Sequence, residues 1–267
     1  MDPEKSLLAA AAIEATKDIV PDVYKDGLQP TVKEIGKNLH TVSKLITVAL
    51  TPISAMVWSY EKIKEQFLPS LEEKLRNVPE ENIITPDPSI AVPIIEALRY
   101  TGHNDELREM FSNLLANSID KETAPTTHPS FVEIIKQINS DEAKIIALLN
   151  SDDAHPIVKV KAVNKENAYY NEFLNNFSLL PFQAKCDIPN QGPSYLENIE
   201  RLGLAEMSYE TYVIRPNAYE PIYDHPIIKE QDAIIKAIDK RFELKKGSFK
   251  RSSYGKKFYE SCILSKQ

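Results

Sequence analysis

Glycine is scarce in this 267-residue sequence, which has 7 glycines against 18 prolines. Gly-rich phosphate loops and extended all-β architectures both depend on glycine at turns and close approaches, so this composition disfavours both. The sequence also contains no Walker-type loop, no Gly-x-Ser-x-Gly segment and no HExxH segment. The motifs that identify P-loop enzymes, α/β-hydrolases and common zinc proteases are therefore missing.

Cysteine and net positive charge are also lacking. Cys186 and Cys262 are the two cysteines, and they form no CxxC pair, which is typical of buried thiols in a reducing compartment. The formal net charge of -7 argues against a molecule that binds nucleic acid by its overall charge. The N-terminal residues place acids beside the first lysine and lack the basic start of a signal peptide. We therefore expect a cytoplasmic protein.

Residues that could catalyse a reaction or bind a metal show no familiar spacing. Three of the five histidines, His128, His155 and His225, precede a proline, which favours extended backbone and predicts cap or turn residues. Paired acids such as those at 72–73 and 152–153 fall on polar faces or in loops, where solvated carboxylates are expected. We expect a protein that is not an enzyme and has no metal or cofactor. A site assembled from distant residues remains open at this point.

Short helical patterns, separated by prolines and glycines, fill residues 68–140. Apolar residues at spacings of three and four predict a helix over 107–119, and Pro129 begins a further one. Gly102 is expected to end the preceding helix with a positive φ. The predicted core residues of the two helices are Leu107, Phe111, Leu114, Leu115, Phe131, Ile134 and Ile135.

The N-terminal part predicts a long helix over about residues 31–67. Residues 45–60 within it carry no charge and include Pro52. The run is shorter than the roughly 20 apolar residues of a transmembrane helix, so we favour a buried helix kinked near the proline. A membrane span and a segment that inserts into a membrane only after activation are the alternatives.

Four short segments in the middle of the chain carry a resemblance. They are EALRY at 96–100, LLA at 114–116, HPSF at 128–131 and DEA at 141–143. Together they resemble the core signature of the abortive infection alpha (Abi-alpha) family of bacterial proteins. The resemblance implies a role in defence against phage and brings no catalytic residues with it.

The composition changes after Asn150, and strand patterns join the helical ones. We predict strands over 156–163, 204–208 and 211–214, helices over 194–202 and 226–241, and a hairpin over 242–251 that turns at 246–248. Leu202-Gly203-Leu204 and the later Tyr254-Gly255 resemble parts of a winged helix. The expected protein is mainly α-helical, with a helical domain at 1–140 and a winged-helix-like α+β module at 141–267.

The main concentration of positive charge lies in this second part. Residues 236–257 contain nine basic residues and two acids. On a wing, Lys245, Lys246, Lys250 and Arg251 would contact phosphates. Glu197 and Glu200 on the presumed recognition helix would repel them, so a solvated face or a protein docking surface is the other interpretation.

Three hypotheses for function follow. The favoured one is a non-enzymatic phage-defence protein that acts through contacts with a phage or host protein. The second is a nucleic-acid-binding sensor or regulator that uses the basic C-terminal residues. The third is a membrane-active effector that uses residues 45–60. The sequence leaves the trigger, the target and the oligomeric state open.

Overall fold

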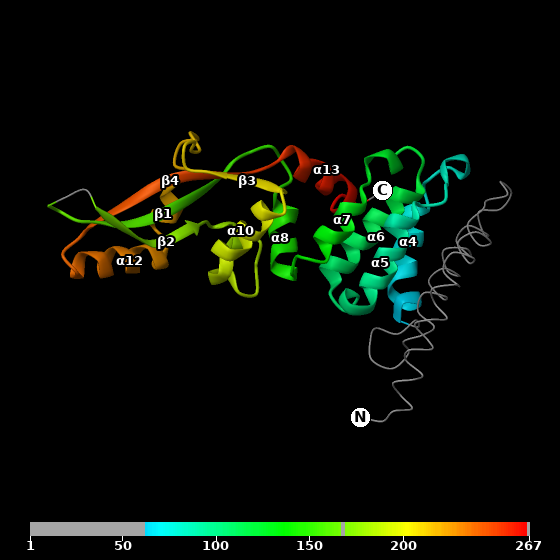
Figure 1. The fold of residues 1–267 in the computed structure, drawn as a ribbon, viewed down its shortest axis with the longest axis horizontal. Helices are drawn as coiled ribbons and strands as arrows, with labels where there is room; N and C mark the ends of the chain where they lie inside the picture. The colour runs from blue at the N-terminus through cyan, green and yellow to red at the C-terminus, as the bar shows by residue number, and fades with distance from the viewer. Residues whose placement is uncertain (1–61, 167–168, 266–267) are drawn as a thin grey trace, which may run out of the picture. The chain divides into compact units, whose positions relative to one another are not determined.

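The structure is a computed structural model that describes residues 62–166 and 169–265 (Figure 1). Residues 45–60 and all but the end of the helix predicted over 31–67 lie outside the described residues. Two compact units divide the chain. Residues up to Gln137 and those from Glu260 onward form the helical unit, and Ile138–Tyr259 form the α+β unit.

The helical unit is built around α6 (Asp105–Ile119), which packs against α4 (Leu68–Leu75), α5 (Pro88–Thr101) and α7 (Pro129–Ile135). A π-helical turn at Ile63–Phe67 and 3-10 turns at Glu80–Asn82 and Ala124–Thr126 complete it. The Asn104 side chain accepts the Leu107 N–H at 3.0 Å, so α6 begins at a conventional N-cap. All seven predicted core residues are buried: Leu107, Phe111, Leu114, Leu115, Phe131, Ile134 and Ile135.

The end of α5 differs from the prediction. Gly102 has a φ of -62° and not a positive one. Its N–H bonds the Leu98 carbonyl at 2.9 Å, and the Asn104 N–H bonds the Thr101 carbonyl at 2.9 Å. The chain thus leaves the helix in a right-handed turn, and the Arg108 guanidinium satisfies the Gly102 carbonyl at 2.8 Å. No left-handed residue is needed because a side chain supplies the missing donor.

The last residues of the chain group with the helical unit, although the sequence placed all of 141–267 in one module. Two buried amides of α6 account for this grouping. Asn113 donates to the Cys262 carbonyl at 3.0 Å, and Asn117 donates to the Ser261 carbonyl at 3.0 Å. They satisfy carbonyls at the end of α13 (Ser253–Cys262), where no intrahelical donor is available.

The α+β unit contains one antiparallel sheet in the strand order β2-β1-β4-β3. Its strands are β1 (His155–Val163), β2 (Tyr170–Phe177), β3 (Ala205–Ser208) and β4 (Arg241–Arg251). The helices α8 (Ser140–Leu148), α9 (Leu180–Gln183) and α10 (Gly192–Arg201) precede β3, whereas α11 (Glu220–Tyr223) and α12 (Pro226–Ala237) follow it. The helix-rich composition and the α+β class agree with expectation.

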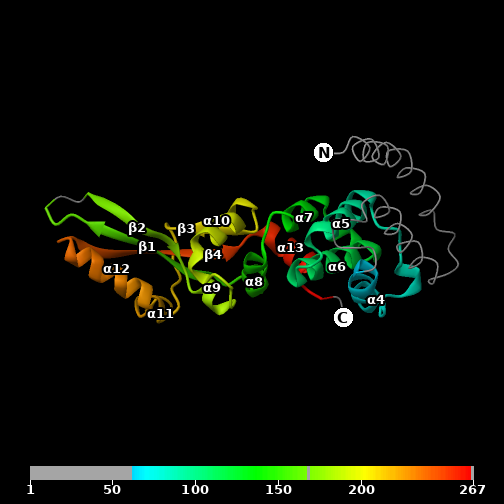
Figure 2. The ribbon, with the colours of Figure 1, turned by 90° about the horizontal axis from the view of Figure 1, so that it is seen from below.

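Helix α12 covers one face of the sheet and runs along β1 and β4 in both views (Figures 1 and 2). The reason is apolar periodicity on both partners. Val158, Val160 and Ala162 alternate inward along β1, and Ile228 and Ile235 lie two turns apart on α12. These five side chains are buried together and form the centre of this core.

Several predicted elements of this unit are wrong. The hairpin over 242–251 is one continuous strand, β4, and residues 211–214 form no strand. Gly247 is not a turn residue. A Cβ there would lie 2.6 Å from the Ser208 carbonyl oxygen, so glycine permits the close approach of the chain after β3. Helix α12 ends at Ala237, because Asp239 takes a φ of 57° that reverses the chain into β4.

Helix α8 begins with a capping box. Its N-cap is Asn139. Asn139 accepts the Glu142 N–H at 2.9 Å, and Glu142 accepts the Asn139 N–H at 2.8 Å. Glu142 also accepts from the Asn198 amide at 2.8 Å, which ties α8 to α10.

The buried carboxylate of Asp141 holds the same elements together. It accepts the N–H groups of Asp187 at 2.7 Å and Ile188 at 3.0 Å, the Tyr195 hydroxyl at 3.0 Å, and Lys144 at 3.3 Å. Burial raises the pKa of Asp141, but these hydrogen bonds outweigh burial and hold the pKa below its usual value. The charged form of this carboxylate is therefore part of the folded structure.

We predict that Leu114→Ala lowers the free energy of unfolding by about 2–5 kcal/mol, because the side chain is fully buried in α6. Thermal melts followed by circular dichroism measure the change. Tyr100→Ala is the matched control, because 63% of Tyr100 is exposed in the same unit. Equal melting temperatures for the Leu114→Ala variant and the wild type would contradict this description of the core.

We predict that Asp141→Asn destabilises the protein at neutral pH by roughly 1–3 kcal/mol, because an amide cannot accept from the same set of donors. The lowered pKa of Asp141 sets the sign of the pH dependence. The stabilisation is fully present above the unfolded-state pKa of about 3.9 and is lost as pH falls through the folded-state pKa. Urea unfolding at pH 7 and pH 3 measures it. A variant penalty as large at pH 3 as at pH 7 would exclude the charged carboxylate as the cause.

Candidate functional site

The β4 strand separates the basic residues that the sequence grouped on a wing. Adjacent side chains on a strand point to opposite faces. Lys246 lies on the side of the sheet that α12 covers, with its Nζ 4.9 Å from the centroid of the Tyr219 ring. Lys245 points the other way, with its Nζ 5.7 Å from the centroid of the Tyr209 ring. The predicted wing hairpin does not exist, and these two lysines do not share a surface.

Three of the four predicted phosphate contacts have carboxylate partners within the unit. Lys250 lies 3.4 Å from Glu206, and Lys245 lies 3.8 Å from Glu210. Arg251 lies 3.1 Å from Asp152 and is largely buried. The structure thus places Lys245, Lys246, Lys250 and Arg251 along one strand without gathering them on one open surface.

The acids of the presumed recognition helix, α10, also take part in local contacts. Glu197 accepts from the Asn176 amide at 2.6 Å, and Glu200 accepts from the Met207 N–H at 3.0 Å. The first contact connects α10 to β2 and the second connects it to β3. Both carboxylates therefore position the helix against the sheet.

Two of the histidines, His128 and His225, make capping or packing contacts. His128 is the N-cap of α7, and its Nδ1 accepts the Ser130 N–H at 3.1 Å, so its predicted capping role is confirmed. The His225 ring packs against the Phe177 and Phe182 rings, which also contact each other, and burial lowers the pKa of His225. Among residues 62–166 and 169–265, no three potential ligands are grouped as a metal site requires.

Both cysteines are buried and unpaired. Burial raises the pKa of Cys186 to about 11 and also raises the pKa of Cys262. Thiols with raised pKa values are protonated at neutral pH, so neither cysteine is poised as a nucleophile.

The sheet has two edge strands, β2 and the four-residue β3, and β2 pairs with β1 alone among the described strands. Tyr169 directly precedes this strand, and Tyr170 and Phe173 lie in its first half; 79%, 51% and 38% of their respective surfaces are exposed. The strand contains no proline and no lysine, which commonly protect sheet edges from pairing. Sequence analysis predicted no strand here, because the apolar residues do not alternate regularly.

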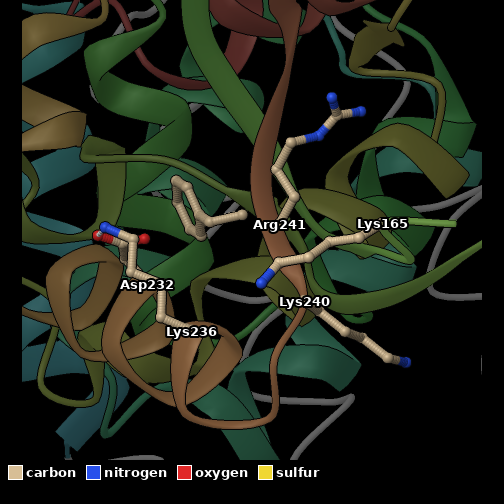
Figure 3. A pocket seen from close by; sticks show the side chains of 6 residues that line it. Lys165, Asp232, Lys236, Lys240 and Arg241 are labelled. Carbon is tan, nitrogen blue, oxygen red and sulfur yellow. Dashed lines mark hydrogen bonds and ion pairs between the residues drawn. The ribbon is translucent and has the colours of Figure 1, made fainter.

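A hollow of about 530 Å³ lies where α12 meets the start of β4 (Figure 3). The residues lining it come from the segment after β1, from α12, and from the beginning of β4. They are Lys165, Asp232, Lys236, Lys240, Arg241 and Phe242. In Figure 3 the Lys165 side chain runs toward Asp232, whereas the side chains of Lys240 and Arg241 point away from it in different directions.

Ion pairs hold three of these four cations. Lys236 lies 2.7 Å from Asp232, and Lys165 pairs with Asp239. Arg241 lies 3.5 Å from Glu243. Within the described residues, Lys240 has no side-chain partner. The hollow therefore combines one free cation with three that are held by exposed or partly exposed acids.

Sequence analysis missed this hollow, although three of its cations lie in the basic run, residues 236–257. The spacing of Asp232, Lys236 and Lys240 places them on successive turns of one helical pattern, and this was the available signal. Lys165 could not be assigned from spacing, because strand pairing brings it to the site.

Comparisons with known proteins extend these observations. One solved structure that is similar is described as that of an uncharacterized protein from the hydrocarbon-degrading marine bacterium Alcanivorax borkumensis. It is 13% identical, the match covers 54% of this chain and 96% of that chain, and the TM-score is 0.36. No curated protein matches.

No helix in the described ranges is both long and apolar enough to cross a membrane. The family model for abortive infection alpha matches residues 59–262 and so includes all four segments that carry the sequence resemblance. By this match across the main part of its length, the chain belongs to the abortive infection alpha family of phage-defence proteins.

Proposed function

We propose that the protein acts in abortive infection by binding another protein, and that the exposed edge of β2 is the contact surface. The observation that carries this proposal is a sheet edge with three exposed aromatic residues, Tyr169, Tyr170 and Phe173. Unpaired N–H and C=O groups on an edge strand can pair with a strand of a partner. Tyrosine and phenylalanine are enriched at protein interfaces.

The family signature supports a non-enzymatic mechanism. Its conspicuous polar residues make structural contacts: Asp141 binds backbone N–H groups, Glu142 completes a capping box, and His128 caps α7. A carboxylate whose oxygens already accept hydrogen bonds from the protein is poorly placed to act on a substrate. These residues are better explained as determinants of the fold.

We retain the winged-helix module as a proposal for the α+β unit. Helices α8, α9 and α10 precede β3, which pairs with β4, and α13 follows β4. Gly255 supports a close packing of this kind, because a Cβ there would lie 1.9 Å from the Leu204 carbonyl oxygen. Where a short wing would connect β3 to β4, this chain instead has α11 and α12.

We also propose that the protein works in the cytoplasm, because its two cysteines are both unpaired. The alternative of nucleic-acid binding through β4 receives less support, since Lys245, Lys250 and Arg251 have carboxylate partners. The membrane-active alternative depends on residues 45–60, which the structure does not describe.

We predict that Phe173→Lys abolishes protection against phage without unfolding the protein, because a charged side chain on the edge blocks strand pairing. Plaque counts on cells expressing the variant should rise to those of cells without the protein. The thermal melt of the purified variant should match that of the wild type, because Phe173 is exposed.

Ile214→Lys is the matched control, because Ile214 is 87% exposed and lies outside β2. This variant should protect cells as the wild type does. Full protection by a folded Phe173→Lys variant would exclude the edge of β2. A photo-crosslinking residue at position 173 tests the partner class directly, and adducts with nucleic acid alone would refute the protein-contact mechanism.

A further inference from the structure

We propose that the Arg99 guanidinium, on α5 of the helical unit, binds a carboxylate of a partner protein. The observation behind this proposal is a buried positive charge for which the described residues provide no acceptor. The surface is separate from the edge of β2, which belongs to the α+β unit, so the proposal goes beyond the contact proposed above.

Arg99 differs from the other charged residues that are buried in the described ranges. The other four each form a hydrogen bond with another residue: Lys74, Asp120, Asp141 and Glu142. Only 9% of Arg99 is exposed, and its guanidinium forms no hydrogen bond or ion pair with any described residue. Buried charges in folded proteins are ordinarily paired, so this cation requires an explanation.

The guanidinium can be reached from solvent at two of its three nitrogens. Nη2 is shielded from solvent and has no hydrogen-bond partner. Nε and Nη1 also lack a partner among the described residues, but they are not shielded in this way. A carboxylate can therefore accept a charge-assisted hydrogen bond from Nε–H or Nη1–H. Because the positive charge is delocalised over all three nitrogens, one such contact compensates the whole group.

The charge of the surrounding unit favours a single carboxylate over a polyphosphate. Residues 62–137 contain 13 acids and 8 basic residues, a net charge of -5. Nucleic acids present a continuous row of phosphates, which an acidic surface repels. One acidic side chain of a partner brings one negative charge to the one unpaired cation.

The neighbouring residue indicates that the partner is a protein. Tyr100 follows Arg99 and is 63% exposed, and Cζ of Arg99 lies 6.0 Å from the centroid of the Tyr100 ring. Arginine and tyrosine are enriched among the residues that contribute most to the affinity of protein interfaces. An exposed tyrosine beside an unpaired guanidinium provides both an apolar surface and a charged donor.

Stability separates a binding role from a structural one. Asp141, Glu142 and His128 have partners within the fold, so their removal is expected to destabilise it. A buried cation without a partner opposes folding, so its removal is expected to stabilise the protein or leave its stability unchanged. The missing acceptor is supplied only in the complex.

Arg99→Met tests this difference, because methionine keeps an unbranched side chain of adaptable shape and removes the charge. The melting temperature of the variant should equal or exceed that of the wild type. Plaque counts on cells that express it should nevertheless rise to those of cells without the protein.

NMR on the full chain measures binding through the Nε–H resonance of Arg99, which is the arginine resonance missing from the spectrum of Arg99→Met. Sodium acetate is the carboxylate probe, and a short single-stranded DNA is the nucleic-acid probe. Sodium chloride at equal ionic strength is the reference, because salt screens charges. Acetate should shift the resonance until it saturates, and the DNA should leave it in place.

Two control variants lie in the same unit. Arg76→Met makes the same substitution at an exposed arginine. Glu96→Gln removes an exposed acid that lies three residues before Arg99 on α5. Both should leave the melting temperature, the protection against phage and the acetate titration unchanged.

Any one of five results would overturn the proposal. A lower melting temperature for Arg99→Met than for Arg76→Met would give Arg99 a structural role. Full protection by Arg99→Met, or no saturable shift with acetate, would exclude the carboxylate contact. A larger shift with DNA than with acetate would indicate a nucleic-acid surface. Loss of protection in Glu96→Gln would indicate an ion pair within α5. The Phe173→Lys variant should titrate with acetate as the wild type does, so failure of either surface leaves the other one standing.

Discussion

The pairing of β1 with β4 determines how the α+β unit uses its charged residues. Nine residue pairs run in uninterrupted antiparallel register from His155↔Phe249 to Val163↔Arg241. Because side chains alternate along a strand, this register directs Lys246 toward the tyrosines of α11 and Lys245 toward the opposite face. A hairpin turn at Gly247 would have placed the same residues on a common tip. The ladder thus excludes the basic wing and at the same time creates the hollow at the end of β1.

Local patterns in the sequence were sufficient where apolar residues recur at the spacing of a helix or a strand. The α6 spacing identified Leu107, Phe111 and Leu114, and alternating residues identified β1. Local patterns failed where an element forms only by contact with a segment that is far away in the sequence. Lys246-Gly247-Ser248 has the composition of a turn, but the glycine is needed because the chain at Ser208 passes close to it. Strand β2 has few alternating apolar residues, and its pairing with β1 is what makes it a strand.

The candidate sites illustrate the same limit. Helical spacing relates Asp232, Lys236 and Lys240, but no spacing relates them to Lys165, which reaches the hollow through the β1–β4 register. The edge of β2 is visible only once the strand order is known. For the buried polar residues, the sequence indicated the segment but not the role. Asp141 and Asn113 fall in or beside segments that the sequence singled out, and only their hydrogen bonds show that they stabilise the fold.

The formal charge of the basic run overstates its capacity for binding anions. Of its nine cations, five lie within 4 Å of a carboxylate: Lys236, Arg241, Lys245, Lys250 and Arg251. Lys246 contacts tyrosine rings instead. In the described ranges this leaves Lys240, Lys256 and Lys257 without an acidic or aromatic partner, and among these three only Lys240 lines the hollow. A net count along the sequence cannot reveal this, because the neutralising acids Asp152, Glu206 and Glu210 come from other segments. Two of the three remaining cations, Lys256 and Lys257, lie on α13, so strand pairing leaves the unpaired positive charge of residues 236–257 divided between two places.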